Sequence, residues 1–382
     1  MPATAFLVQQ PGESADQGVL KLEIIRSLFL RVFLGGLLLC AAPLALQADT
    51  TNTDDEQPLF YPMPPNQPRL QYLAKFSSVQ DVSTKSSRFR NFVFGGEDKE
   101  GHLVEKPYGL ATFQGAIYVV DTRGNGYAVF DIANGRSSFV RPTGAGTLSK
   151  PINIVIDTDG TRYLSDTGRN QVLVFDARER FQRAYGIEGQ FRPAGLAIAG
   201  NRLYVSDVLN HQVHVLDKLS GDVLFSFGEA GSEPGQFFHP TNLAVAGDGS
   251  IYVSDQSNFR LQQFSKDGEL IRVIGQAGAV PGKFARPKGI AIDKDDRIYV
   301  VDSAFQNVQI LAPEGGALMY FGGPGDDRGN MYLPTVVKVD YESVPYFEKY
   351  AAPGFDIEYL VLVANQFGQN KVLVFGFGSL QE

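Results

Sequence analysis

The sequence contains no tryptophan, one cysteine and four histidines among its 382 residues. A single cysteine cannot form an intramolecular disulfide, so the folded chain depends on packing alone. No Ser-His-Asp, Cys-His or phosphate-loop pattern is evident. Acidic residues outnumber basic ones by 42 to 34, which gives a formal net charge of −8. An acidic surface repels phosphate backbones, so the composition argues against nucleic-acid binding.

A short apolar phrase that ends on aspartate, such as SIYVSD at 250–255, recurs along most of the chain. The copies end on Asp121, Asp166, Asp207, Asp255 and Asp302. A proline precedes each copy and a sixth opens a final, altered copy, at spacings of 42 to 47 residues: Pro107, Pro151, Pro193, Pro240, Pro287 and Pro334. A period in this range with short strands indicates a repeat architecture.

Each repeat contains four short apolar segments bounded by turn residues. In the repeat that begins at Pro240 these segments are 241–245, 250–255, 260–265 and 270–275. Four such strands make one antiparallel sheet, which cannot bury both of its faces alone. Six sheets stacked radially can bury them, so the sequence predicts an all-β, six-bladed β-propeller of four-stranded blades.

The sixth repeat ends after three strands, at 335–340, 358–365 and 371–376. The segment 69–78 near the other end of the chain reads as a strand without a repeat of its own. We therefore expect 69–78 to be the outer strand of the last blade, within a propeller domain that covers 69–382. This pairing would remove the open sheet edges that promote aggregation.

The phrases P-x-G-[IL]-A, IYVSD and G-x-x-x-G-x-F-x-x-P resemble NHL repeats over about 69–377. The resemblance implies a six-bladed propeller. NHL propellers include RNA-binding modules, sensor domains of bacterial kinases, a metal-dependent amidating lyase and secreted bacterial proteins of unassigned role. The terminal NQFGQNKVLVFGFG at 365–378 is most similar to the secreted bacterial group. That resemblance implies an association with multihaem c-type cytochromes or an envelope complex.

The first 48 residues read as a leader. Within 26–48, two arginines precede a short apolar run, and small residues near Ala48 could form a cleavage site, which is typical of a signal peptide. Cys40 lies where a lipoprotein carries its acylated cysteine, so ordinary cleavage and lipid anchoring both stay open. Either predicts a periplasmic or extracellular protein that meets a membrane only through the leader or a lipid on Cys40. The acidic, proline-rich stretch 49–68 predicts a disordered or polyproline tether.

Two sets of polar residues recur around the predicted ring. The aspartates can accept hydrogen bonds from backbone N–H groups of the following loops, which favours a structural role over a metal or catalytic one. A basic residue precedes five of the prolines: Lys106, Lys150, Arg192, His239 and Arg286. The neighbouring loops add further basic residues: Arg123, Arg169, His211 and Arg260. This basic ring either binds an anionic ligand or an acidic partner, or it has no binding role and only keeps the exposed loops hydrated.

The sixth repeat carries a long aromatic turn at 341–357 that includes Tyr346, Phe347 and Tyr350. We expect it on the face opposite the basic ring, either as a protein-binding loop or folded back as a lid on the lower channel.

No catalytic residue, metal ligand or cofactor is predicted. Asn153 and Asn242 occupy matching positions near the channel, but no acid joins them. His211 and His214 should point to opposite faces of a strand and cannot readily share a metal. The sequence therefore favours a non-catalytic, extracytoplasmic protein-binding scaffold. A metal-dependent lyase- or lactonase-like enzyme and a small-anion sensor are the alternatives.

Overall fold

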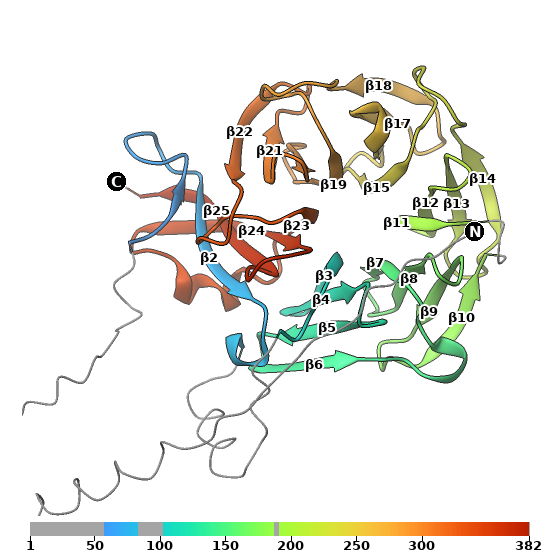
Figure 1. Cartoon of the computed structure of the whole chain (residues 1–382), viewed down its shortest axis with the longest axis horizontal. Coiled ribbons are helices and arrows are strands. Elements are labelled where there is room, and N and C mark those ends of the chain that lie inside the picture. The colour runs from blue at the N-terminus through green and yellow to red at the C-terminus, as the bar shows by residue number, and fades with distance from the viewer. Residues whose placement is uncertain (1–56, 83–101, 187–190, 382) are drawn as a thin grey trace, which may run out of the picture. The chain divides into compact units, whose positions relative to one another are not determined.

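The computed structural model describes residues 57–82, 102–186 and 191–381, which belong to one compact unit. The leader 1–48 and residues 49–56 lie outside the described residues. Six antiparallel sheets surround a central axis, with one edge strand of each sheet innermost (Figure 1). The all-β six-bladed propeller predicted from the sequence is confirmed. Among the described residues, no helix is both long and apolar enough to cross a membrane.

The strands follow the repeat, and each blade runs from its innermost to its outermost strand. Blade 1 contains β3 (Pro107–Phe113), β4 (Ala116–Asp121), β5 (Gly126–Asp131) and β6 (Arg136–Val140). Blade 2 contains β7 (Pro151–Ile156), β8 (Arg162–Asp166), β9 (Gln171–Phe175) and β10 (Phe181–Tyr185). Blade 3 contains β11 (Pro193–Ala199), β12 (Arg202–Asp207), β13 (Gln212–Asp217) and β14 (Val223–Phe227).

The remaining blades keep this order. Blade 4 contains β15 (Pro240–Val245), β16 (Ile251–Asp255), β17 (Arg260–Phe264) and β18 (Leu270–Ile274). Blade 5 contains β19 (Pro287–Ile292), β20 (Ile298–Asp302), β21 (Asn307–Leu311) and β22 (Ala317–Gly322). Blade 6 contains β23 (Pro334–Asp340), β24 (Phe355–Asn365), β25 (Val372–Leu380), β2 (Leu70–Phe76) and β1 (Phe60–Tyr61). The short 3-10 segments are Val79–Asp81, Gly144–Gly146, Gln256–Asn258, Val344–Tyr346 and Glu348–Tyr350.

Apolar side chains from neighbouring blades meet in the seams between sheets. Between blades 4 and 5, Leu261 and Ile274 share one buried cluster with Ile298 and Val300. The link between these blades adds Phe284, whose ring lies 2.3 Å from the position that a Cβ on Gly275 would occupy. Gly275 also has a φ of 76°, so the glycine of the linking motif is needed both for its conformation and for space.

The last blade is closed by the amino-terminal end of the propeller unit. Strand β2 pairs antiparallel with β25, from Leu70 opposite Phe377 to Phe76 opposite Val372, which confirms the prediction for 69–78. Strand β1 adds a fifth strand beyond β2. Leu59, Phe60 and Tyr61 therefore differ from the expected tether, because their side chains pack on the blade. The ring of Tyr61 contacts those of Phe321 and Phe375 at centroid distances of 6.1 Å each.

The repeated aspartates support the loops, as the sequence predicts. The carboxylate of Asp302 accepts hydrogen bonds from the backbone N–H groups of Ala304 and Phe305 in the following loop, at 3.0 and 3.2 Å. It also accepts N–H groups of Ala285 and Arg286, in the link before the blade proline, at 2.7 and 3.1 Å. The aspartate thus joins two loops that meet on one face of the ring.

Candidate binding face and central channel

The links before the prolines and the loops after the repeated aspartates lie side by side, and we call the face that they form the upper face. In blade 1 the carbonyl of Lys106 accepts the N–H of Thr122 at 3.1 Å. In blade 5 the carbonyl of Arg286 accepts the N–H of Ser303 at 3.0 Å. The basic residues expected around the channel mouth therefore share this face.

Five of these residues occupy the link position before the proline. Lys150, Arg192, His239 and Arg286 are exposed, whereas Lys106 is half-buried. The Lys106 ammonium lies 5.6 Å from the ring centroid of Phe367. None of the four lysine and arginine side chains forms an ion pair with another described residue.

The basic residues in the neighbouring loops serve other purposes. Arg123 forms an exposed ion pair with Glu105 at 3.3 Å. Arg169 donates hydrogen bonds to the carbonyls of Ala145 and Thr147, at 2.7 and 2.8 Å.

Arg260 departs most from the expectation, because its side chain is turned into the protein. It is 8% exposed, pairs with Asp255 at 2.9 Å and donates to the carbonyls of Ser232, Glu233 and Gln236. Its charge holds a loop in place, as does that of Arg169. Neither guanidinium is free to serve as the main contact for a partner.

The predicted histidines have separate surroundings. The ring of His211 stacks on Phe238 at 5.5 Å, and its Nδ1 accepts the N–H of His239 at 3.3 Å. The Nε2 of His214 lies 3.1 Å from the buried carboxylate of Asp207. Burial alone would raise the pKa of Asp207, but hydrogen bonds from His214, Asn210 and backbone N–H groups outweigh it and lower that pKa.

A third cation joins Lys106 and Arg286 at the channel mouth and was missed from the sequence. Lys288 is 7% exposed, and its ammonium lies 5.4 Å from the ring centroid of Tyr108. Burial, with repulsion from Arg286 and Lys106, lowers the pKa of Lys288 to about 8. The available signal was a lysine directly after Pro287, in an otherwise apolar innermost strand. We call Lys106, Arg286 and Lys288 the mouth cluster.

Exposed apolar side chains accompany the cations on the upper face. They come from the same links and loops: Leu209, Phe238, Phe259, Tyr332 and Phe367. Phe238 is 50% exposed. Cations mixed with exposed aromatic rings are a common composition for protein-binding surfaces.

The aromatic turn of blade 6 is part of the core rather than a free loop, which contradicts one sequence prediction. Phe347 is fully buried and packs edge to face on Phe76 at 6.0 Å, so its assignment as a binding residue is wrong. Tyr350 packs on Phe347, and its carbonyl accepts the Nε2 of Gln71 at 3.1 Å. Only Tyr346 of the three predicted residues is exposed. The turn packs against blade 1 and β2 and does not line the channel cavity.

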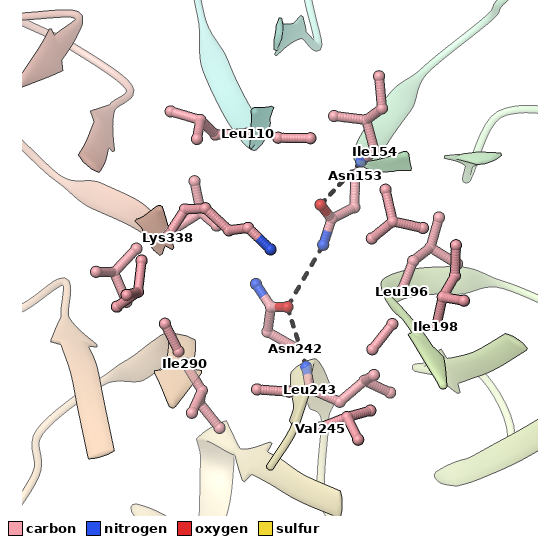
Figure 2. A pocket seen from close by; sticks show the side chains of 18 of the residues that line it. Leu110, Asn153, Ile154, Leu196, Ile198, Asn242, Leu243, Val245, Ile290 and Lys338 are labelled. Carbon is pink, nitrogen blue, oxygen red and sulfur yellow. Dashed lines mark hydrogen bonds between the residues drawn. The ribbon is translucent and has the colours of Figure 1, made fainter. Parts of the chain in front are cut away.

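The channel contains a cavity of about 220 Å³ that all six innermost strands line. Asn153 and Asn242 lie in it, as expected from the sequence (Figure 2). Lys338 also lies in it and is the only charged side chain of the lining. The sequence offered one signal that was missed, a lysine inside the apolar innermost strand of the altered repeat, TVVKVD at 335–340.

The described residues contain no group of three histidine, cysteine, aspartate or glutamate side chains that could hold a metal ion. The lumen instead carries the positive charge of Lys338 between its apolar walls. An ammonium group at this point repels a cation, so the residues present in the channel do not suit an axial metal.

Comparisons with known proteins agree with the fold. A family model described as a 6-bladed beta-propeller matches residues 245–310. A Caenorhabditis elegans protein named probable peptidyl-alpha-hydroxyglycine alpha-amidating lyase pgal-1 is 33% identical over 118 residues, which is 29% of this chain and 34% of that protein. Protein brain tumor of Drosophila melanogaster is 39% identical over 74 residues, 19% of this chain and 7% of that protein.

The chain thus spans about a third or less of the length of these curated relatives. Among solved structures, a gluconolactonase of Xanthomonas campestris superposes with a TM-score of 0.54 at 13% identity, over 84% of this chain and 98% of that one. These similarities define a six-bladed propeller with distant relatives among NHL-type propellers. At such low identity the structural match shows the fold alone.

Proposed function

We propose that this propeller is a non-catalytic recognition module that binds an acidic protein partner on its upper face. The mouth cluster is the observation that carries the proposal. Three cations gather at one end of the channel on a protein of net charge −8, and none is paired with a described carboxylate. Clustered like charges in partly desolvated surroundings favour an anionic ligand.

The proposal also assigns a setting, which follows from the resemblance to secreted bacterial NHL proteins. We propose a periplasmic or extracellular scaffold, held by its leader or by a lipid on Cys40. The partner would belong to an envelope complex such as one with multihaem c-type cytochromes. An acidic patch on that partner would meet the mouth cluster, and the exposed aromatic side chains would bury apolar area around it.

Charge variants test the proposal. The upper-face variant combines Lys106→Gln, Arg286→Gln and Lys288→Gln, and the control combines Lys266→Gln, Lys294→Gln and Lys349→Gln, which are exposed in turns of the opposite face. Both variants change the net charge equally. Capture from an envelope extract of the source organism, at 50 and 200 mM salt, should yield a partner that the wild-type protein and the control retain.

The upper-face variant should bind that partner about tenfold more weakly at low salt, since charges at an interface mainly set the association rate. Salt should weaken wild-type binding more than binding by this variant. Equal capture by all three proteins, or a partner lost only from the control, would overturn the proposal.

A further inference from the structure

The cavity in the channel is apolar except for a few side chains. Its walls include Leu110, Leu196 and Ile290, and its carboxamides are Asn153 and Asn242. Both asparagines are buried, with Asn242 only 5% exposed. A buried amide without a partner for each of its polar atoms is costly, so the direction in which each asparagine points is informative.

Hydrogen bonds fix the orientation of the two carboxamides. The Oδ1 of Asn153 accepts the N–H of Ile154 at 2.8 Å, and the Oδ1 of Asn242 accepts the N–H of Leu243 at 3.0 Å. The Nδ2 of Asn153 donates to the Oδ1 of Asn242 at 3.4 Å. Exchanging N and O in either amide would place two donors against each other. The oxygens are therefore occupied, and the Nδ2 of Asn242 is left facing the lumen without an acceptor among the described residues.

Lys338 supplies a second donor at the same place. In the view of Figure 2, its terminal nitrogen and the Nδ2 of Asn242 both point towards the middle of the lumen. The ammonium has no hydrogen bond or ion pair with a described residue, although water can reach it through the cavity. Lys338 is exposed to solvent within the open channel. The strands around it still desolvate its ammonium and lower its pKa, and Asp340 on the same strand partly opposes that effect. The other lining residues carry no titratable group.

The cavity opens towards the face opposite the mouth cluster. At its open end, Ile198, Val245 and Val339 are half-buried and reachable by solvent. At its other end, Thr335 and Lys288 are buried. A molecule would thus reach Lys338 without crossing the upper face.

We infer that the channel binds a small organic monoanion, a carboxylate with a short aliphatic chain. Its carboxylate would accept hydrogen bonds from Lys338 and Asn242, and its chain would lie on the apolar walls. Both groups donate hydrogen bonds, and the oxygens of the two asparagines are already occupied, so the site favours an anion over a cation. The single ammonium balances a single negative charge. The volume of about 220 Å³ is that of a handful of water molecules, which matches a molecule of a few carbons.

Calorimetric titration with sodium butyrate tests the inference, with sodium chloride and sodium phosphate as comparison anions at matched ionic strength. The protein variants are Lys338→Met, Asn242→Leu and, as a control outside the cavity, Lys266→Met. Butyrate should bind the wild-type protein and the control alike. Its affinity should fall about 10- to 100-fold in Lys338→Met, since a charge-assisted hydrogen bond is lost, and less in Asn242→Leu.

Failure of butyrate to bind the folded wild-type protein at millimolar concentration would overturn the inference, as would equal binding by Lys338→Met. Tighter binding of phosphate than of butyrate would overturn the choice of a monocarboxylate. If Lys338→Met does not fold, Lys338→Gln replaces it, with the same expected loss. The upper-face variant should bind butyrate normally, so this inference and the proposed function can fail separately.

Discussion

The two ends of the channel differ in chemistry although the same six strands form both. The upper end carries the cations Lys106, Arg286 and Lys288. The other end leads into an apolar cavity with one ammonium group, that of Lys338. Lys288 and Lys338 stand at positions where the other repeats have another residue, whereas Lys106 and Arg286 belong to the basic position that five repeats share. In contrast, the aspartate that every regular repeat keeps serves the loops. In this propeller, the repeated aspartates serve structure, and the two lysines that depart from the repeat, Lys288 and Lys338, mark candidate sites.

Removing the closing strands should have the largest effect, because both ends of the channel depend on a closed ring. A chain that begins at Val79 lacks β1 and β2 and leaves the edge of β25 unpaired. We expect no cooperative thermal unfolding by circular dichroism and no folded monomer. A chain that begins at Gln57 is the control and should unfold as the full chain does. Cooperative unfolding of the shorter chain would show that the ring needs no closure.

Phe347→Ala should destabilise the protein by about 3 to 5 kcal/mol, since it leaves a cavity beside Phe76. Tyr346→Ala, one residue earlier and exposed, should cost about 1 kcal/mol or less. Urea denaturation measures both. Similar losses would mean that the turn is not anchored through Phe347.

Asp302→Ala should cost about 3 kcal/mol, because it leaves four loop N–H groups without their acceptor. Asp267→Ala, in an exposed turn, is the matched control and should change the free energy of unfolding by about 0.5 kcal/mol or less. Butyrate binding should survive in the folded fraction of Asp302→Ala. Selective loss of binding without loss of stability would give the aspartate ring a functional role.

The pH dependence of stability should report the mouth cluster. The pKa of Lys288 is about 8 in the folded protein and near 10.4 for an ordinary lysine. Between these values the unfolded chain binds more protons, so stability should rise with pH there, by about 1 kcal/mol from pH 7 to pH 9. Lys288→Met should lack this rise, and Lys266→Met should keep it. A rise of equal size in Lys288→Met would place its origin elsewhere.

The repeat made most of the fold predictable. The prolines, the aspartate phrases and the missing fourth strand were enough to place every blade and the closing strand 69–78. The sequence did not reveal that 59–61 also packs on the blade. A proline-rich composition is typical of a tether, and the apolar run within it is only three residues long. It also misassigned Phe347, since an aromatic residue in a long turn looks the same whether it faces solvent or a neighbouring blade.

The candidate sites were only partly predictable for a related reason. Basic residues before the prolines could be placed on one face from the sequence. The sequence could not show that the Arg260 side chain turns inward and pairs with Asp255, because that depends on the direction of the side chain. Lys288 and Lys338 were missed because an apolar strand pattern was taken to be apolar throughout. Their importance appears only when strands from different blades converge on one axis.

Site-specific photo-cross-linking tests the central claim most directly. A photoreactive phenylalanine analogue would replace Phe238 on the upper face, Leu318 on the outer rim or Tyr346 on the opposite face, all of which are exposed. Irradiation in an envelope extract should link a partner protein through position 238 and not through the other two. Cross-linking of a partner through 318 or 346 but not through 238 would contradict recognition by the upper face.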